Sequence, residues 1–551
     1  MNPIAVTRAV LLTSILAAPV TAQKAVGLDA FHNNEANLPG HYSWDAADPG
    51  GFSELGKLIQ GMGGELRTVR ERASAKALAG LDVLIVVDPD TPAETAEPKF
   101  FEKGEIRAIE KWVRAGGQLA LLGNDKGNTE FEHFNKLSAR FGIEFIETKY
   151  RDAHGASKIT VPSGSAITGK GLSAYFVDAA PLRITANESE TLLSADGAAL
   201  MSLVRHGKGS VLALGDPWVY NEYIGRADNR RMASNVFRHL LRAAPVPPVR
   251  LIFDTDMGND IDDALALAML HSLESRGEAK ILAVTITKDN PFAAPYVDLV
   301  NHFYGRPAIP IGMVHGGKTP DDGKYIRAVA ERSVYKRRLK SGAEAPDATA
   351  LLRNVLSGEA DRSVVLVQVG FSTNLARLLE APGGAELVAR KVRLISAMAG
   401  AFPSGKKEYN VHTDIAAARG LFAGSPVPIV FSGYEVGENI RYPASSIEKD
   451  YAYAADHPVA EAYRAYMKMP YDRQTWDLAA ALYAVRPAAG FFSISEPGTV
   501  TVDDEGKTVF TPGVNGRHRY LTASPAQRER ALEAMIELCS RRPDRTLKSD
   551  Q

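Results

Sequence analysis

Short apolar runs alternate with segments of helical spacing along the first half of the chain. Val83–Val87 and Gln118–Leu122 are continuous apolar runs, typical of buried parallel strands. Between them, Glu105–Ala115 has the spacing of an amphipathic helix and ends at Gly116-Gly117, a helix stop signal. Ser210–Leu214 is a further strand candidate. This order predicts a three-layer α/β sandwich.

The same alternation returns after residue 249. Asp263–Leu273 is a predicted helix that directly follows a predicted strand. The predicted strands of this half are Arg250–Phe253, Lys280–Ile286, Val364–Val369, Val392–Ala397 and Val427–Phe431. We expect a doubly wound, mostly parallel sheet, again in three layers. Ligands of such sheets bind beyond the carboxyl ends of the strands.

The length of the chain and a proline-rich segment predict two domains. The chain has 551 residues, more than one ordinary core accommodates. Pro245, Pro247 and Pro248 disfavour both helix and central strand. We therefore expect one domain over 23–243, a linker over 244–249 and a second domain over 250–551.

The N-terminus resembles a secretion signal. Arg8 precedes the short apolar run Ala9–Ala18, and Val20-Thr21-Ala22 offers a small-residue cleavage pattern. A buried N-terminal helix is the alternative. No later stretch of 18 apolar residues predicts a membrane span. We expect a signal over 1–22 and an exported protein, periplasmic or secreted.

Composition narrows the class of protein further. Hydrophobic residues make up 45% and charged residues 23%, as in soluble globular proteins. The net charge of −1 gives no basic surface for nucleic acid. Cys539 is the only cysteine, so no intramolecular disulfide forms, and we expect a packed thiol in the helical segment Arg528–Ser540. The sequence leaves monomer and homo-oligomer open.

Five aspartates lie within ten residues at a predicted strand–helix junction. They are Asp254, Asp256, Asp260, Asp262 and Asp263. Clustered carboxylates repel one another unless a cation neutralises them, and hard oxygens suit calcium or magnesium. Gly258 permits a tight turn that lets them converge. The alternative is a solvated acidic helix N-terminus.

This cluster also carries a family resemblance. Leu251–Leu267 resembles the opening signature of the inosine-uridine preferring nucleoside hydrolase family, a strand followed by Asp-x-Asp-x-Gly and Asp-Asp-Ala. Here Asn259-Asp260-Ile261 fills a gap that is often one residue, so the turn is longer and Asp260 has no assigned role.

Later segments fit the family in the expected order. Gly370–Asn374 resembles its Gly-x-x-Thr-Asn turn, and Met398–Phe402 with Glu408–Asn410 resembles its substrate loop. Trp476-Asp477 resembles its late aspartate. The resemblance extends over about 249–541.

The resemblance implies a calcium-dependent nucleoside hydrolase. Its implied calcium ligands are Asp256, Asp263, the Thr373 carbonyl and Asp477, with Asp256 also the general base for water. Its implied ribose-binding residues are Asp262, Asn290, Glu408 and Asn410. Asp254 is expected to support the loop. The transition state should resemble an oxocarbenium ion.

Trp476 stands where many members have a histidine that protonates the leaving base. Tryptophan cannot transfer that proton, but it stacks on a purine face, as the resemblance to purine-preferring members implies. The alternative is a packing aromatic. His412 is an acid candidate near the substrate loop, with a bystander role favoured.

The first domain resembles the class I glutamine amidotransferase fold. Gly116–Asp125 occupies a position like the family's nucleophile strand, but it holds no cysteine. We therefore expect a non-catalytic binding or scaffolding domain.

The leading hypothesis is an exported, calcium-dependent hydrolase that cleaves ribonucleosides to base and ribose, with Trp476 favouring purine nucleosides. One alternative is an N-glycosidase for another ribosyl compound. The other is a non-enzymatic, calcium-dependent binding protein. The small-molecule nucleoside is the expected partner.

Overall fold

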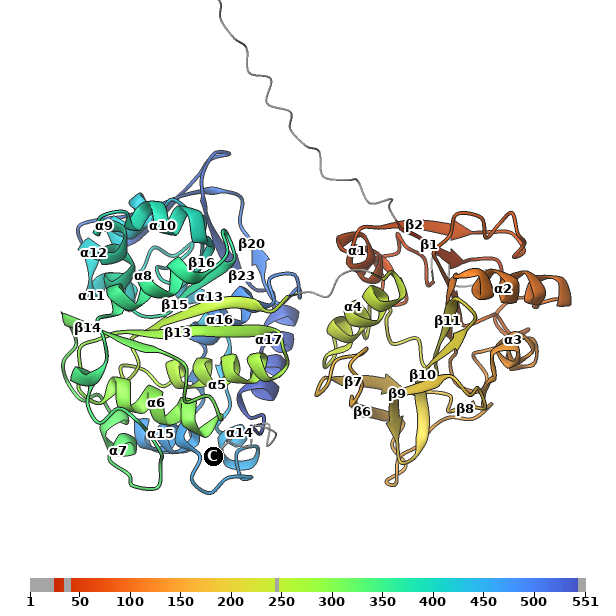
Figure 1. Cartoon of the computed structure of the whole chain (residues 1–551), viewed down its shortest axis with the longest axis horizontal. Coiled ribbons are helices and arrows are strands. Elements are labelled where there is room, and N and C mark those ends of the chain that lie inside the picture. Colours follow the sequence, from red (N-terminus) through yellow and green to blue (C-terminus); the bar gives the residue numbers. More distant parts are fainter. Residues whose placement is uncertain (1–23, 34–40, 243–246, 544–551) are drawn as a thin grey trace, which may run out of the picture. The chain divides into compact units, whose positions relative to one another are not determined.

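The computed structural model describes residues 24–33, 41–242 and 247–543. The predicted signal over 1–22 lies outside these residues, as does part of the predicted linker. The chain divides into two compact units (Figure 1). Unit 1 comprises Met1–Ile224 and Asp228–Ala244, and unit 2 comprises Gly225–Ala227 and Pro245–Gln551.

Unit 1 contains a nine-stranded sheet with the order β2-β1-β3-β4-β11-β10-β8-β5, and β9 pairs with β10. The strands from β2 to β11 in this order are parallel, and the remainder are antiparallel. The strands are β1 Lys24–Asp29, β2 Gly64–Val69, β3 Val83–Val87, β4 Gln118–Leu122, β5 Ile143–Phe145, β8 Leu182–Ile184, β9 Ser189–Ala195, β10 Ala198–His206 and β11 Gly209–Leu214. A separate hairpin joins β6 Lys158–Pro162 and β7 Ser173–Val177.

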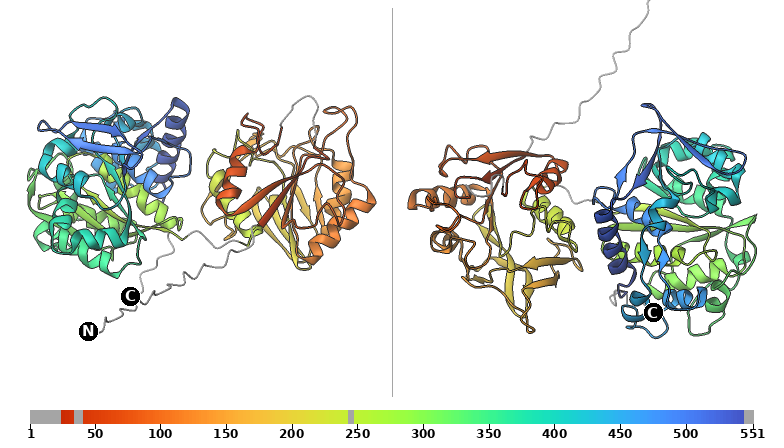
Figure 2. Two further views of the ribbon diagram at one scale, coloured as in Figure 1. Left: turned by 90° about the horizontal axis from the view of Figure 1, so that it is seen from above. Right: turned by 180° about the vertical axis from the view of Figure 1, so that it is seen from behind.

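Helices cover both faces of this sheet. Ile85 packs with α1 and α4, whereas its neighbour Leu84 packs with α2 and α3 on the opposite face. The helices are α1 Ser53–Gly61, α2 Lys103–Ala115, α3 Phe131–Ser138, the short η1 Ala139–Phe141 and α4 Asn229–Leu240. The predicted three-layer α/β sandwich is therefore confirmed for unit 1 (Figure 2).

Unit 2 is built on a ten-stranded sheet with the order β14-β13-β12-β15-β16-β17-β23-β21-β22, and β20 pairs with β23. The strands from β14 to β23 in this order are parallel. The strands are β12 Val249–Thr255, β13 Ala279–Lys288, β14 Ile311–Lys318, β15 Val364–Gln368, β16 Val392–Met398, β17 Ile429–Ser432, β20 Ser493–Ile494, β21 Gly498–Val502, β22 Thr508–Pro512 and β23 His518–Thr522. A small ribbon pairs β18 Arg441–Tyr442 with β19 Arg473–Gln474.

Successive residues of β12 enter two different cores. Leu251 and Phe253 pack with α5 and α16, whereas Ile252 packs with α8 and α9. The first face is covered by α5 Asp262–Ser275, α6 Ala293–Phe303, α15 Pro458–Tyr466, α16 Trp476–Val485 and α17 Pro525–Cys539. The second face is covered by α8 Ala348–Gly358, α9 Thr373–Glu380, α10 Gly384–Lys391 and α12 Ile415–Gly424. The predicted doubly wound sheet is confirmed (Figure 1).

Shorter helices lie in the connections of unit 2. They are α7 Ile326–Ala330, η2 Gly342–Glu344, α11 Tyr409–Thr413, α13 Tyr434–Glu438 and α14 Ala444–Lys449. Among the described residues, no helix has the length and apolar character that a membrane crossing requires.

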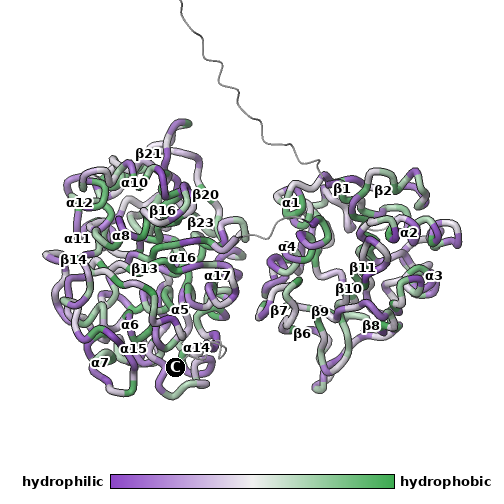
Figure 3. Tube along the Cα trace, viewed as in Figure 1, coloured by the Kyte–Doolittle hydropathy of each residue, from purple (hydrophilic) through white to green (hydrophobic). Residues whose placement is uncertain are grey.

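Helix α5 is buried on every side along its first twelve residues, Asp262–Leu273. It lies beneath the sheet against β13, and it also contacts α16 and α17. The apolar interior around these elements is visible in the hydropathy colouring (Figure 3). This burial explains why Asp262 and Asp263, at the first turn of α5, are hidden from bulk solvent although they are charged residues.

Most predicted element positions agree with the structure to within two residues. The strand predicted at Lys280–Ile286 extends to Lys288, and the one predicted from Val427 begins only at Ile429. Pro428 explains the second difference, because proline has no backbone donor for a central strand. β12 begins at Val249, which the sequence had assigned to the linker.

The single thiol should report on the folding of unit 2. Cys539 at the end of α17 is fully buried, its Sγ lies 3.4 Å from the Leu265 carbonyl oxygen, and burial raises the pKa of the thiol. A disulfide reagent that absorbs on reaction should therefore label no thiol in the native chain and one thiol per chain in denaturant. Labelling of the native chain within minutes would contradict this packing.

Candidate active site

A pocket of about 400 Å³ lies at the carboxyl ends of β12, β15 and β16, beside the first turns of α5 and α16. Its acidic lining residues are Asp256, Asp260, Asp262, Asp263, Glu408 and Asp477. Its other lining residues are Asn259, Val369, Met398, Lys407, Tyr409, Asn410, Tyr434, Arg473 and Trp476. The pocket therefore brings together seven of the nine predicted site residues: Asp256, Asp262, Asp263, Glu408, Asn410, Trp476 and Asp477.

Asp254 supports the pocket from behind and does not line it. Its Oδ1 accepts hydrogen bonds from Thr285 Oγ1 at 2.6 Å and from Asn374 Nδ2 at 2.8 Å. These bonds join β12 to β13 and α9. Burial raises the pKa of Asp254 to about 7. The contacts agree with the supporting role that the sequence indicated.

Three carboxylates form a tight acidic group among the described residues of unit 2. Asp262, Asp263 and Asp477 each have an oxygen within 4.8 Å of the others, and all three are buried. The backbone N–H of Asp477 donates to Asp262 Oδ2 at 3.0 Å. The Thr255 hydroxyl donates to Asp263 Oδ1, whereas Asp263 Oδ2 has no hydrogen-bond partner among the described residues.

The electrostatics of this group fit a hard cation. Burial, followed by the charges of neighbouring carboxylates, raises the pKa of Asp263 and Asp477 well above the usual aspartate range. A buried carboxylate oxygen without a donor is costly unless a cation or proton compensates it. Oxygen-only ligands of this type suit calcium or magnesium.

Asp256 lies on the same pocket and is held by a chain of polar contacts. Its Oδ2 accepts from Asn259 Nδ2 at 2.7 Å, and Asn259 Oδ1 accepts from Lys288 Nζ at 2.7 Å. Lys288 also donates to the Thr319 carbonyl at 2.8 Å. Burial raises the pKa of Asp256 to about 6 and lowers that of Lys288.

Sequence reasoning missed Lys288, because a lysine at a strand end normally reaches solvent. The extension of β13 by two residues beyond its predicted end places Lys288 inside. The acidic turn is two residues longer than the family's usual turn, and this length could have pointed to Lys288, because Asn259 in the turn bridges Lys288 to Asp256.

Thr373 lies outside the pocket lining. It begins α9, and its hydroxyl donates to Asp414 Oδ2 at 2.6 Å. The residue that lines the pocket from this turn is Val369, at the end of β15. A side chain at Gly370 would meet the Asp256 backbone nitrogen at 2.5 Å, so glycine permits the close approach of the two turns.

Asn290 is the second predicted residue outside the pocket lining. It is fully buried, and its Nδ2 donates to the Pro320 carbonyl at 2.8 Å and to Asp322 Oδ1 at 3.1 Å. Its amide therefore fastens the loop after β14. His412, the acid candidate, is exposed and also lies outside the lining.

Glu408 and Asn410 shape the opposite wall. Glu408 caps α11 by accepting from the backbone N–H groups of Asn410 and Val411 at 2.8 and 3.1 Å, and it also accepts from the backbone N–H of Gly400 at 3.0 Å. Burial raises the pKa of Glu408 to about 7. Asn410 Nδ2 donates to the Val369 carbonyl at 2.7 Å, which ties this wall to β15.

Trp476 is half-buried at the start of α16. Its indole Nε1–H donates to the Tyr434 carbonyl at 2.9 Å. A side chain at Gly437 would meet Trp476 Cδ1 at 2.3 Å, so glycine makes room for the indole. Arg473 lies beside it and donates from Nε to Asp260 Oδ1 at 2.8 Å, a partnership that sequence reasoning did not foresee.

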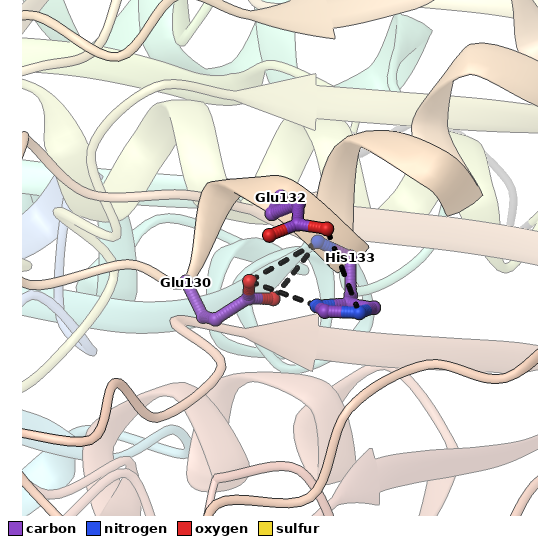
Figure 4. A group of neighbouring side chains, drawn as sticks. All are labelled: Glu130, Glu132 and His133. Atoms are coloured by element: carbon purple, nitrogen blue, oxygen red, sulfur yellow. Dashed lines mark hydrogen bonds and ion pairs between the residues drawn. The ribbon is translucent and has the colours of Figure 1, made fainter.

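Unit 1 contains a second group of side chains with metal-ligating atoms (Figure 4). Glu130, Glu132 and His133 lie at the start of α3. Glu130 accepts from the His133 backbone N–H at 3.0 Å and so caps the helix, and Glu132 is exposed. Helix capping accounts for this group.

Comparison with known families now identifies the class of protein. Residues 251–543, more than half of the 551-residue chain, match the family model described as inosine-uridine preferring nucleoside hydrolase. The chain belongs to this family, and it is a hydrolase that acts on N-glycosyl compounds. The family typically binds a metal ion and acts on small-molecule nucleosides, and the acidic group of unit 2 offers such an ion a site.

Solved nucleoside hydrolase structures match about half of the chain. An inosine-guanosine nucleoside hydrolase has 19% identity and a TM-score of 0.43, with 53% of this chain and 98% of that chain covered. A plant nucleoside hydrolase has 21% identity and a TM-score of 0.43, with coverages of 53% and 99%. An inosine-uridine preferring nucleoside hydrolase from Bacillus anthracis has 18% identity and a TM-score of 0.42, with the same coverages.

The remaining comparisons concern unit 1 and the curated proteins. Residues 44–237 match a family model described only as a domain of unknown function, DUF4350. The resemblance of unit 1 to the amidotransferase fold therefore stays a prediction. A search of curated proteins found no match.

Calcium should stabilise the protein more at neutral than at acidic pH. Carboxylates whose pKa is raised by folding stabilise the folded state when they are protonated, and this contribution is lost as pH rises from about 4 towards 7. Protons and the cation compete for these carboxylates, so the cation adds more stability at neutral pH, where fewer protons are bound. Asp254, Asp256 and Glu408 titrate in this window. A cation that binds this site, present at about 100 times its dissociation constant, would contribute about 2.7 kcal/mol, or about 5 to 10 °C in Tm.

Thermal melts of metal-free protein with and without added calcium test this expectation at pH 5 and pH 7.5. Asp263→Asn should remove the increment, whereas Asp504→Asn should retain it, because Asp504 is exposed and paired only with Arg419. An increment that is equal at both pH values, or that survives Asp263→Asn, would contradict the site.

Proposed function

We propose that the chain hydrolyses the N-glycosidic bond of ribonucleosides to free base and ribose in a calcium-dependent reaction, with purine nucleosides preferred. The observation that carries the proposal is the pocket of unit 2. It joins a buried acidic group, Asp262, Asp263 and Asp477, to an aromatic wall that includes Trp476. Its volume of about 400 Å³ suits a molecule of nucleoside size.

Asp256, Asp263 and Asp477 are the proposed carboxylate ligands of the metal, and all three line the same pocket. The Thr373 carbonyl is the backbone ligand that the family resemblance implies, and Val369, which lines the pocket, is a second candidate for that ligand. Calcium, when bound, neutralises the carboxylates, attracts the ribose hydroxyls and makes a nearby water easier to deprotonate.

Asp256 is the proposed general base. Asn259 holds one of its oxygens, and Lys288 holds Asn259, so the orientation of the carboxylate is fixed before substrate binds. Asp262, Glu408 and Asn410 are proposed to bind the ribose hydroxyls. As the glycosidic bond breaks, the ribose gains positive charge, which the surrounding carboxylates stabilise.

Trp476 is the proposed purine-selective residue. Its indole is fixed by the bond to the Tyr434 carbonyl and by the fit against Gly437, so its face can stack on a base with little loss of freedom.

A second candidate function is supported by the two cations in the pocket lining, Lys407 and Arg473. They favour an N-glycosidase that acts on a ribosyl compound with negative charge, such as a nucleotide derivative. Nucleoside 5′-phosphates therefore belong in the substrate panel.

For the rest of the chain, we propose export directed by the signal over 1–22 and a non-catalytic, amidotransferase-like binding or scaffolding domain over 23–243. The absence of cysteine from Gly116–Asp125 supports the lack of amidotransfer activity.

Loss of the general base should abolish most turnover. The full chain with calcium should release hypoxanthine from inosine, and Asp256→Ala should reduce kcat by about 10²- to 10⁴-fold, the usual effect of general acid–base catalysis. Chelation should abolish the reaction, and calcium should restore it. Chromatography of the free base together with a reducing-sugar assay measures both products.

Asp504→Ala is the matched control, since this exposed aspartate lies outside the pocket lining. Turnover that persists in Asp256→Ala would contradict the assigned base, and base release only from nucleotides would favour the second candidate function.

Trp476→His tests the origin of the purine preference. Loss of the indole face should lower kcat/KM for purine nucleosides and narrow the ratio between inosine and uridine. The measurement is the ratio of the two kcat/KM values in the variant and in the wild type. An unchanged ratio would rule out stacking by Trp476.

A further inference from the structure

We propose that Arg473, positioned by Asp260, stabilises the departing base during hydrolysis. The inference rests on the proposed function, because it assigns the group that assists the leaving base within the same pocket. It also gives a role to Asp260 and to the long acidic turn that carries it.

The Arg473–Asp260 pair is a two-pronged contact. Arg473 Nε donates to Asp260 Oδ1 at 2.8 Å, and Nη2 donates to Asp260 Oδ2. Such a fork fixes the plane of the guanidinium group. The two side chains are 18% and 26% exposed, so the pair is largely withdrawn from water but still open to the pocket.

Neighbouring groups restrain both partners. The guanidinium carbon of Arg473 lies 5.3 Å from the ring centre of Trp476 and 5.1 Å from that of Tyr466. Arg473 also belongs to β19, where it pairs with Tyr442 of β18. The backbone carbonyl of Asp260 accepts from the Tyr325 hydroxyl at 2.7 Å. A surface arginine with no role in the pocket would not need these contacts.

The guanidinium group of Arg473 has one nitrogen, Nη1, that can donate to a ligand. Asp260 uses Nε and Nη2, and Nη1 shows no hydrogen bond to any residue that the structure describes. Arg473 lines the pocket together with Trp476, against whose ring it lies. A base that stacks on the part of the Trp476 ring not covered by Arg473 would therefore have a fixed cationic donor nearby.

The chemistry of bond cleavage calls for such a donor. When the bond between ribose C1′ and the base nitrogen breaks, the electron pair moves onto the base, which becomes anionic until water protonates it. Arg473 remains protonated throughout and stabilises that charge by a hydrogen bond. Within the described lining there is no histidine, and the Trp476 N–H is already bonded to Tyr434.

Lys407 is the other cation in the pocket lining, and it is a weaker candidate. Its side chain is 47% exposed and lies 3.9 Å from Glu505 on the outside. Its ammonium group is therefore solvated and less directed than the fixed fork of Arg473.

The test compares two ribosides that differ in their need for leaving-group assistance. Inosine releases a poor leaving group, whereas p-nitrophenyl β-D-ribofuranoside releases a stabilised phenolate. In the full chain with calcium, Arg473→Met should reduce kcat/KM for inosine by about 10²- to 10³-fold, the usual cost of one such donor, and leave the p-nitrophenyl riboside within about threefold.

Two further variants separate position from charge. Asp260→Asn should lower kcat/KM for inosine by about tenfold and spare the p-nitrophenyl riboside, because it loosens Arg473 without removing the cation. Arg473→Lys retains the charge, and it should recover part of the loss seen with Arg473→Met on inosine. If Arg473→Met fails to fold, these two variants still show whether the effect is selective for inosine.

Arg441→Met is the matched control. Arg441 lies on β18 in the same small ribbon, its side chain is 53% exposed, and it pairs with Glu438 outside the pocket lining. It should leave both substrates unchanged.

Each other outcome overturns the inference. Equal losses on both substrates would indicate a structural ion pair, and no loss on either would remove Arg473 from the reaction. A loss confined to inosine 5′-phosphate would indicate recognition of a substrate anion. A wild-type chain that cleaves neither riboside contradicts the proposed function itself, whereas a wild type active on both with unselective variants contradicts only this inference.

Discussion

The burial of clustered carboxylates is the constraint on which the pocket of unit 2 depends. Asp256, Asp262, Asp263 and Asp477 are all at most 4% exposed, and burial together with their neighbours' charges opposes ionisation. Such a group is stable near neutral pH only with bound protons or with a cation. The same property makes the group useful, since a site that attracts a hard cation can also attract hydroxyl oxygens and acidify water. The same clustered carboxylates therefore destabilise the folded chain and provide the chemistry of the pocket.

The fold brings this group together from distant parts of the sequence. Asp263 and Asp477 are neighbours because α5 and α16 pack on the same face of the sheet and begin near its carboxyl edge. Polar contacts behind the pocket then hold the turns: Asp254 joins three elements, and Lys288 acts on Asp256 through Asn259. Gly370 and Gly437 allow the close approaches that a side chain would block. These contacts hold the carboxylates in defined positions, which suits a reaction that depends on fixed charges.

The sequence predicted the layers and most strands, because apolar periodicity is a local signal, and seven of its nine candidate site residues line one pocket. Positions that depend on tertiary contacts carry no such local signal. Thr373 and Val369 lie four residues apart on one turn, and only packing determines which of them reaches the pocket. Asn290 follows the predicted strand as expected, yet its amide turns to the loop at Pro320. Arg473 gave no local signal, since its partner Asp260 is 213 residues away. The acidic turn is two residues longer than the family's usual turn, and this difference can be read from the sequence. The contact of Asp260 with Arg473 is seen only in the structure.

The most direct test of the account is a calorimetric titration of the metal-free chain with calcium at pH 7 in two buffers that differ in ionisation enthalpy. Because carboxylates with raised pKa values hold protons that the cation displaces, we expect one calcium ion per chain and a net release of protons on binding. The observed enthalpy should therefore depend on the buffer. Absence of binding, or binding with the same enthalpy in both buffers, would contradict a buried carboxylate cluster as the metal site.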